Sequence, residues 1–286
     1  MQIAMIGDKL VEAERIDSAY LDYGMFFGDG VYEVLRSYDG KLFALEEHLA
    51  RFKRSLKEVD IEGIDIETVR QRVLKAFEKC KTPNAKIYFH ITRGAGPRDH
   101  AAQGLEPRFL LLITKIEDWR EQKNKGISVM TAADTRWKRC DIKSLNLLPN
   151  VLAKRAAQKR GCQEAIFVDE NGYITEGASS AFFAIFANVL QTAPLTANIL
   201  PSITRQFVLE ICKNVGLDVL ERQIKVQDAT KADELFIAVS SKDIVPVIKF
   251  NEVEISDGRP GKFTKLLMSE FAKLVREKAA TKTRRH

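Results

Sequence analysis

The stretch VYEVLRSYDGKLFAL, at residues 31–45, is the most informative one for the fold. Hydrophobic and polar side chains alternate from Val31 to Tyr38, and a period of two is typical of a strand with one buried face. The dipeptide Asp39-Gly40 then favours the positive φ angles of a type I′ turn. The sequence therefore predicts a β-hairpin whose second strand covers residues 41–45.

Downstream of the hairpin the apolar spacing changes to that of helices. Residues 46–59 and 66–80 repeat apolar side chains at intervals of three and four, as amphipathic helices do. Two strands are expected next, at residues 86–92 and 108–114. The Gly-rich polar loop 93–104 separates them, and loops of this kind often carry function.

A strongly polar segment at residues 117–126 divides the chain. Domain boundaries fall in exposed polar linkers that few contacts cross, so this segment is the best candidate for a boundary. The expected organisation is a smaller N-terminal α/β domain over residues 1–116, a linker over 117–126 and a larger C-terminal domain over 127–286.

The second half mixes strands and helices without regular alternation. Strands are expected at residues 127–132, 164–168, 181–186, 218–223, 234–239 and 244–250. Helices are expected at residues 150–160, 204–214 and 262–278, with Gly161 and Gly216 as C-terminal caps. A doubly wound parallel sheet would alternate strand and helix, so the pattern indicates an α+β fold with a barrel-like second domain.

The charge distribution argues against a nucleic-acid-binding protein. The net charge is +6, but residues 273–286 contain six basic residues and one acidic residue and so supply +5 of it. The rest of the chain is nearly neutral and holds no recognisable nucleic-acid module, although the basic tail keeps that function as an alternative. No signal peptide and no apolar run of membrane-spanning length is found, so we expect a cytoplasmic protein.

Motif spacing indicates neither a metal site nor a nucleotide fold. The four cysteines lie far apart and are expected to be reduced thiols, and the four histidines lack the spacing of metal ligands. Gly28-Asp29-Gly30 has no third glycine of a dinucleotide fingerprint, and no phosphate-loop Gly-Lys-Ser/Thr occurs.

Two residues of the second half could carry chemistry, although placement alone favours ordinary roles for both. Lys143 precedes three leucines that suggest entry into the core, and only a buried lysine has the lowered pKa that makes its amine nucleophilic. Glu176 follows the turn Asn171-Gly172, at the end of an expected strand. A surface lysine and a solvated carboxylate are the simpler interpretations.

The order of several short motifs favours functional roles for Lys143 and Glu176. Together these motifs resemble class IV aminotransferases, which use pyridoxal 5′-phosphate. The motifs are FGDGVYEV (27–34), EHLARF (47–52), TRG (92–94), RDH (98–100), CDIKSLN (140–146), TEGASS (175–180) and ITR (203–205). Within the class, the sequence is most similar to D-amino acid (D-alanine) aminotransferases. The resemblance implies fold type IV, in which two domains hold the cofactor in the cleft between them, and a homodimer.

The resemblance also implies roles for individual residues toward the cofactor. Lys143 would hold pyridoxal phosphate as a Schiff base and carry the proton that moves during the reaction. Glu176 would pair with the pyridine nitrogen and keep the ring an electron acceptor. The phosphate would be bound by Arg51, by the backbone N–H groups of Ile203 and Thr204, and by Ser241.

For the substrate, the resemblance implies a carboxylate-binding set made of Tyr32, Arg98 and His100. An arginine presents a fork of donors that suits a carboxylate. Tyr32, Val34 and Arg36 share one face of their strand, which would line the substrate pocket. Several relatives have lysine in place of Arg36, so the side-chain preference stays open.

The expected activity moves an amino group between D-amino acids, such as D-alanine and D-glutamate, and the 2-oxo acids 2-oxoglutarate and pyruvate. Three other activities of the same class remain as alternatives. They are those of a branched-chain L-amino acid aminotransferase, an (R)-amine transaminase and an aminodeoxychorismate lyase.

Overall fold

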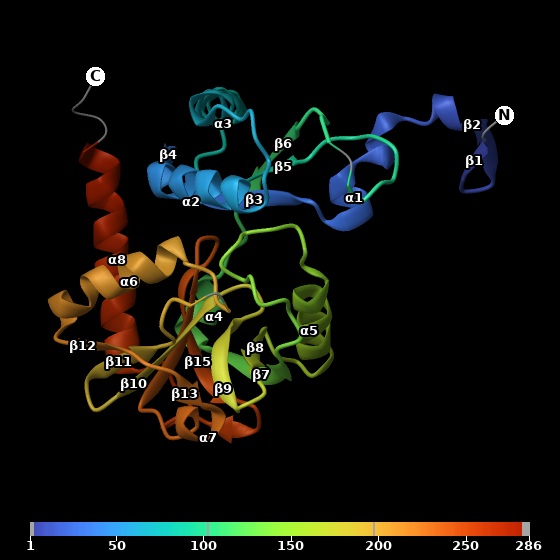
Figure 1. Ribbon diagram of the computed structural model, residues 1–286. Helices are drawn as coiled ribbons and strands as arrows, with labels where there is room; N and C mark the ends of the chain where they lie inside the picture. Colours follow the sequence, from blue (N-terminus) through green and yellow to red (C-terminus); the bar gives the residue numbers. More distant parts are fainter. Residues whose placement is uncertain (1–2, 102, 197, 282–286) are drawn as a thin grey trace.

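The computed structural model describes residues 3–281 except Ala102 and Ala197. Its strands form a small two-stranded sheet, a four-stranded sheet and a ten-stranded sheet (Figure 1). The four-stranded sheet uses residues from 30 to 115 and the ten-stranded sheet residues from 127 to 254. This confirms the expected α+β class with a smaller N-terminal and a larger C-terminal unit.

Residues 3–27 form short elements that the sequence patterns did not predict. Strands β1 (Ile3–Ile6) and β2 (Lys9–Glu12) pair as a hairpin, and the next elements are η1 (Ala13–Arg15), η2 (Ser18–Leu21) and α1 (Tyr23–Phe27). Each has at most five residues, which is too short for apolar periodicity to show.

The predicted hairpin is confirmed at its turn and shorter than expected in its second strand. Strand β3 (Gly30–Tyr38) pairs with β4 (Lys41–Leu42), and φ is 47° at Asp39 and 79° at Gly40, as a type I′ turn requires. Strand β4 ends early because Ala44 has a φ of 55° and helix α2 (Leu45–Glu58) begins directly after it.

Two helices cover one face of the four-stranded sheet, which has the order β4-β3-β5-β6. The sheet is completed by β5 (Ala85–Thr92) and β6 (Arg108–Lys115), and the second helix is α3 (Ile66–Cys80). Odd-numbered residues such as Val31, Leu35, Ile87 and Phe89 are fully buried against α2 and α3. The even-numbered residues of β3 and β5 therefore form the opposite face of this sheet, which carries tyrosine and basic side chains.

The expected linker is partly helical. Helix α4 (Arg120–Lys125) occupies most of residues 117–126, between the last strand of one sheet and the first strand of the other. A polar sequence indicates exposure to water, but it does not distinguish a short exposed helix from a coil.

The ten-stranded sheet has the order β12-β11-β10-β14-β15-β7-β8-β9-β13, with β16 on β15. Its strands are β7 (Ile127–Ala133), β8 (Glu164–Val168), β9 (Tyr173–Gly177), β10 (Ala181–Phe186), β11 (Val189–Thr192), β12 (Asp218–Glu221), β13 (Ile224–Lys225), β14 (Glu234–Val239), β15 (Asp243–Phe250) and β16 (Val253–Glu254). Most pairs are antiparallel, but β7 pairs in parallel with both β15 and β8, and β11 pairs in parallel with β12.

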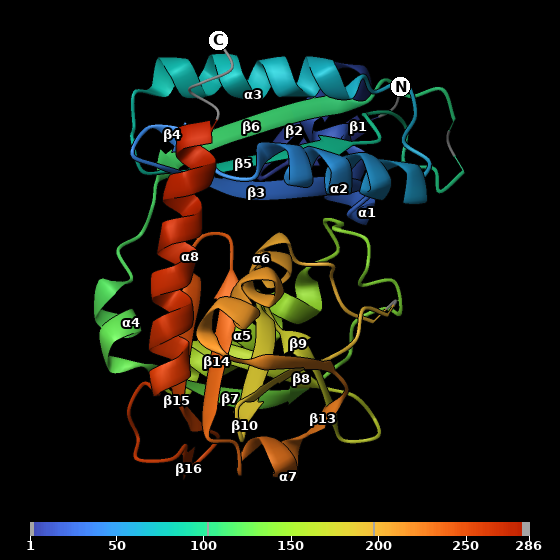
Figure 2. The ribbon, with the colours of Figure 1, turned by 90° about the vertical axis from the view of Figure 1, so that its left-hand side faces the viewer.

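Helices surround this sheet: α5 (Leu148–Lys159), α6 (Ile203–Ile211), η3 (Cys212–Val215), α7 (Val226–Ala229) and α8 (Lys262–Thr281). Gly161 and Gly216 have φ angles of 73° and 75° just after their helices, so both predicted caps are confirmed. Figure 2 shows α8 running beside both sheets. Phe271 of α8 contacts Phe43, and Lys278 forms an ion pair with Glu47.

The end of the basic tail, residues 282–286, lies outside the described residues. Over the part that is described, no helix is both long and apolar enough to cross a membrane.

Candidate active site

A cavity of about 420 Å³ lies between the two large sheets. Tyr32 and Val34 line it from the tyrosine-bearing face of β3, and Glu176 lines it from β9. Lys143 and the β14–β15 turn with Ser240 close its other sides. The volume falls in the range of small-molecule sites.

Lys143 reaches this cavity from an irregular segment between β7 and α5. The segment is held at its backbone: the N–H of Tyr32 donates to the carbonyl of Lys143 at 2.9 Å, and the N–H of Lys143 donates to Ser55 Oγ at 3.3 Å. The Lys143 ammonium lies 4.3 Å from the centre of the Tyr32 ring. Among the described residues nothing accepts a hydrogen bond from Nζ, so the amine is available for a ligand.

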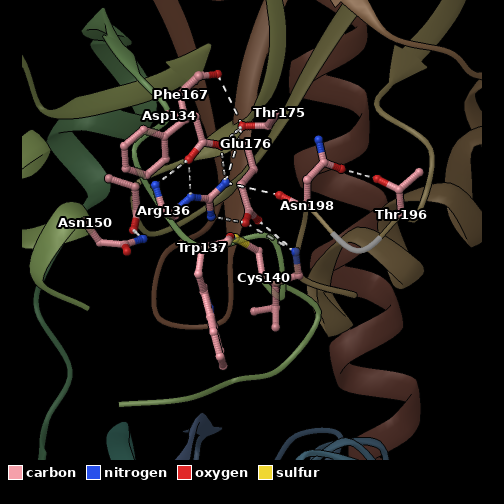
Figure 3. Close-up of polar contacts among 12 residues, drawn as sticks. Asp134, Arg136, Trp137, Cys140, Asn150, Phe167, Thr175, Glu176, Thr196 and Asn198 are labelled. Carbon is pink, nitrogen blue, oxygen red and sulfur yellow. Dashed lines mark hydrogen bonds and ion pairs between the residues drawn. The ribbon is translucent and has the colours of Figure 1, made fainter. Parts of the chain in front are cut away.

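Glu176 is a buried carboxylate that is held from two sides. Arg136 donates to its Oε1 at 2.5 Å, and the N–H of Leu200 donates to both oxygens at 3.2 and 3.3 Å (Figure 3). Burial raises the pKa of Glu176, and the positive charges of Arg136 and Lys143 partly offset that rise. The carboxylate can therefore accept a hydrogen bond or a positive charge from a ring placed in the cavity.

Arg136 itself belongs to a larger network. Its Nε and Nη2 donate to Asp134 at 2.9 and 2.7 Å, and Phe167 lies under its guanidinium at 4.5 Å (Figure 3). The Thr175 hydroxyl donates to the same Asp134 carboxylate at 2.8 Å. One buried arginine thus joins two carboxylates and fixes the position of Glu176.

Arg51 is anchored by a second buried carboxylate. Its Nε and Nη2 both donate to Glu33 at 2.8 Å, and its Nη1 donates to the carbonyl of Pro201 at 2.9 Å. His48 lies 2.7 Å from the same Glu33 carboxylate. Burial opposes ionisation of Glu33, but Arg51 and His48 outweigh it and hold the pKa of this carboxyl well below its usual range.

The start of α6 lies close to Arg51, as the Arg51–Pro201 contact shows. Ile203 is the first helical residue, and the Ser202 cap accepts a hydrogen bond from the N–H of Arg205 at 3.2 Å. The N–H groups of Ile203 and Thr204 belong to the first turn, where a helix has no internal acceptors for them. Ser202 and Ser241 line the cavity, whereas Ile203 and Thr204 line a smaller cavity beside it.

The three residues expected to bind substrate do not lie together. Tyr32 lines the cavity, but Arg98 and His100 are not among the described residues that line it. Their loop lies beside α1, where Phe27 contacts the His100 ring at 4.8 Å and the Arg98 guanidinium at 5.0 Å. The expectation that Tyr32 lies beside Arg98 and His100 is therefore wrong within a single chain.

The position of Arg36 also differs from what was expected, because Arg36 does not line the main cavity. Its Nη1 donates to Asp243 at 3.0 Å, and its guanidinium lies over the Tyr38 ring at 4.1 Å. These contacts hold it against the smaller cavity, and the main cavity is lined instead by Val34 and by Lys86 of β5.

Two partners of the predicted residues were missed in the sequence. Glu33 could have been noticed, because it stands between Val31 and Leu35 on the apolar face of its strand, where an acid needs a buried partner. Arg136 gave no such signal, since it lies in an irregular segment with several other basic residues.

Solved structures share this fold. A branched-chain amino acid aminotransferase of Escherichia coli superposes with a TM-score of 0.83 at 26% identity, over 94% of this chain and 92% of that one. A hypothetical aminotransferase from Mycobacterium tuberculosis in a PLP-bound form superposes with a TM-score of 0.78 at 22% identity, over 91% and 95% of the two chains. The fold is that of the fold-type IV aminotransferases.

Sequence comparison defines the family. Residues 30–250 match amino-transferase class IV. A D-alanine aminotransferase of Bacillus licheniformis is 37% identical over 284 residues, covering 95% of this chain and 99% of that protein. One from Staphylococcus epidermidis is 36% identical, covering 96% and 98%. The chain belongs to the class IV aminotransferases, whose cofactor is pyridoxal 5′-phosphate.

The residues of the cavity fit this cofactor. An amine without a hydrogen-bond acceptor suits its aldehyde, and a buried carboxylate suits its pyridine nitrogen. An arginine beside the first turn of a helix suits its phosphate. All three groups lie at or next to one cavity of adequate size.

Proposed function

We propose that this enzyme transfers the amino group between D-amino acids, such as D-alanine and D-glutamate, and the 2-oxo acids pyruvate and 2-oxoglutarate. The observation that carries the proposal is the near full-length similarity to D-alanine aminotransferases, joined to a cavity lined by Lys143, Glu176 and Arg51. The cavity lies between the units expected at residues 1–116 and 127–286, and we propose that the cofactor binds there.

In this mechanism the side chains of the cavity divide cofactor binding and proton transfer among them. When bound, pyridoxal phosphate supplies an aldehyde that takes up the amino group and a ring that accepts the electron pair of the broken Cα–H bond. Lys143 would hold the cofactor covalently through Nζ, and the same amine would move the proton. Glu176 would pair with the pyridine nitrogen of the bound cofactor, and Leu200 keeps the carboxylate oriented through its N–H.

Phosphate binding is assigned to Arg51, to the N–H groups of Ile203 and Thr204, and to Ser241. Glu33 already neutralises Arg51, so the helix start contributes the additional positive potential that a dianion needs. Tyr32 contributes from the substrate side, where its ring lies against Lys143.

The position of Arg98 and His100 supports a homodimer with shared sites. Both residues lie outside the cavity of their own chain, so they can bind the α-carboxylate only if a second copy brings them there. Large apolar side chains are exposed on the same unit, including Met25 at 67%, Leu110 at 43% and Leu112 at 51%. Such exposed side chains are what a second copy would cover.

A half-reaction assay tests the substrate class. The wild type should convert D-alanine faster than L-alanine, and Arg98→Ala and His100→Ala should erode that preference while the spectrum of the bound cofactor stays unchanged. Each charge-assisted hydrogen bond to the carboxylate is worth about 1.5–3 kcal/mol, which is enough to select one orientation. A wild type that preferred L-leucine or (R)-1-phenylethylamine would support one of the other class IV activities instead.

Mixing Lys143→Ala, which should be inactive, with Arg98→Ala, which should turn over D-alanine slowly, tests the shared site. In a hybrid dimer of Lys143→Ala and Arg98→Ala, the intact Lys143 of one chain meets the intact Arg98 of the other, so activity should return on mixing. No recovery, with hybrid dimers present, would contradict the shared site. Borohydride reduction and peptide mapping should place the cofactor on Lys143.

For the cellular location we propose the cytoplasm. The four cysteines, Cys80, Cys140, Cys162 and Cys212, are free thiols, as is usual in a reducing compartment.

A further inference from the structure

Lys86 stands out on the sheet face that covers the cavity. It lies in β5 directly opposite Arg36 of β3, and its side chain lines the cavity together with Val34 and Tyr32. The alternation of β5 places Lys86 on the same face as Tyr88, away from α2 and α3. The lysine therefore faces the site and not the bulk solvent behind the sheet.

The cavity holds more positive charge than its own carboxylate can balance. Five basic residues line it, Arg51, Lys86, Arg136, Lys143 and Lys154, and the lining contains a single acid, Glu176.

Three of the five have a carboxylate of their own. Arg51 pairs with Glu33. Arg136 pairs with Asp134 and Glu176, and Lys154 lies 2.9 Å from Glu164. Among the described residues, the side-chain ammonium of Lys86 has neither a hydrogen-bond acceptor nor an ion-pair partner. Once Lys143 is assigned to the cofactor, Lys86 is the lining cation left without a counter-charge.

Two further basic residues, Arg36 and Lys242, lie near Lys86 but do not line the main cavity. Arg36 cannot serve a ligand there, because Asp243 and Tyr38 hold its guanidinium. The Lys242 ammonium lies 3.7 Å from the centre of the Trp119 ring. Burial, and then repulsion from Lys154 and Lys86, lower the pKa of Lys242 to about 8, although the carboxylates of Glu164 and Glu117 oppose this shift.

We propose that Lys86 binds a second carboxylate of the substrate, so that the enzyme prefers dicarboxylic amino acids and oxo acids over those with an apolar side chain. This inference rests on the proposed aminotransferase function. A half-buried ammonium attracts a carboxylate more strongly than an exposed one does, because water screens it less. A substrate with a methyl group at that position would leave the ammonium unpaired, which is the condition under which a polar site discriminates strongly.

The test compares two oxo acids in the holoenzyme with D-2-aminobutyrate as the common donor. In Lys86→Met the KM for 2-oxoglutarate should rise about tenfold or more, as the loss of a charge-assisted contact predicts. The KM for pyruvate and both kcat values should change less than about twofold, because Lys86 does not touch the reacting atoms.

Two further variants distinguish loss of the positive charge at residue 86 from a general effect of replacing a lysine. Lys115→Met, at an exposed position of β6 outside the cavity lining, should behave as the wild type does. Lys86→Arg should keep most of the preference for 2-oxoglutarate. The proposal would be overturned if Lys86→Met changed the KM values for 2-oxoglutarate and pyruvate by the same factor, or changed neither of them.

A binding measurement keeps this inference separate from the proposed function. Glutarate should raise the melting temperature of the wild-type holoenzyme more than butyrate does, and Lys86→Met should abolish the difference. Equal effects of the two acids on the wild type would count against a subsite at Lys86 even if transamination is observed. A wild type without transaminase activity would reject the proposed function, whereas glutarate binding would still decide the role of Lys86.

Discussion

At the scale of single residues, the site depends on charges that are placed in pairs. Glu33 fixes Arg51, and Arg136 fixes Glu176. Arg51 and Glu176, which are expected to bind the phosphate and the ring of the cofactor, are thus each held by a buried partner of opposite charge. Replacing one member of such a pair leaves the other charged and buried, which is more costly than losing a surface ion pair.

The residues expected to contact the cofactor could be predicted from the sequence, but not all of the residues that fix their side chains in place. Lys143, Glu176 and Arg51 stand in motifs with a fixed order, so they could be proposed as site residues. Arg136 acts through a contact with Glu176 that joins residues 40 positions apart, and no pattern in one sequence records such a contact. The distance of Arg98 and His100 from the cavity was equally invisible, because a motif carries no information on which chain completes a site.

Arg136→Met should change how cofactor binding depends on pH. Burial raises the pKa of Glu176 and Arg136 opposes that rise, so removing Arg136 should raise this pKa further. The charged form of Glu176 exists above its pKa, and the favourable contact with the ring is lost as the pH falls through it. The pH midpoint for loss of bound cofactor, followed by its absorbance, should therefore move upward by about one unit or more.

The neighbouring Arg139 supplies the control for this prediction. Its side chain is 44% exposed and pairs with Glu58 and Asp141. Arg139→Met should leave the pH midpoint where it is in the wild type. An unchanged midpoint in Arg136→Met would show that this arginine does not act on Glu176.

At the scale of elements, helix α8 is held at its first turn by a carboxylate of the ten-stranded sheet. Glu234 of β14 accepts hydrogen bonds from the N–H groups of Phe263 and Thr264, at 2.8 and 2.7 Å, and from the Thr264 hydroxyl at 2.6 Å. A Cβ atom at Gly261 would lie 2.0 Å from Glu234 Cδ. The glycine is thus required for the carboxylate to reach the helix start.

Glu234→Ala should lower the melting temperature by several degrees. The variant leaves buried N–H donors without an acceptor, at a cost of about 1–3 kcal/mol in the free energy of unfolding. Differential scanning calorimetry would measure the change. Glu252→Ala, at a side chain that is 94% exposed, is the control and should have the melting temperature of the wild type. Equal melting temperatures for the two variants would show that the cap contributes nothing.

The elements themselves were predicted with uneven success. Long periodic segments such as α2, α3 and α8 were found because their apolar spacing extends over several turns. The short elements before β3 were not predicted, and residues 117–126 were predicted only as a linker, without the helix α4. In a helix of six residues with no buried side chain, the apolar stripe that reveals a helix does not exist.

At the scale of the whole molecule, Asp243 joins the two large sheets. It lies at the start of β15 and accepts hydrogen bonds from Arg36 and Tyr38 of β3. Lys123 of α4 donates to its other oxygen at 2.7 Å. The carboxylate therefore connects the N-terminal sheet, the segment between the units and the turn that carries Ser241.

Asp243→Asn should loosen this junction without unfolding either sheet. Asparagine tolerates the φ of 60° at this position, so the effect of charge is isolated from backbone strain. Hydrogen exchange should become faster in α4 and in residues 240–243, and the cofactor should bind more weakly. Asp257→Asn, at an exposed turn, is the control, and equal exchange in the two variants would contradict the role of Asp243.

The parallel pairing of β7 with β15 has a consequence for how the protein forms during synthesis. Ile127 pairs with Val247, and about 120 residues separate them along the chain. The four-stranded sheet uses only residues 30–115 and can assemble while the remainder is still being translated. The ten-stranded sheet must wait until β15 has left the ribosome, and contacts of such long sequence separation form slowly. The nascent chain thus passes through a stage in which its first unit is folded, while the edges of β7 and β10 that later pair with β15 and β14 are still open to chaperones.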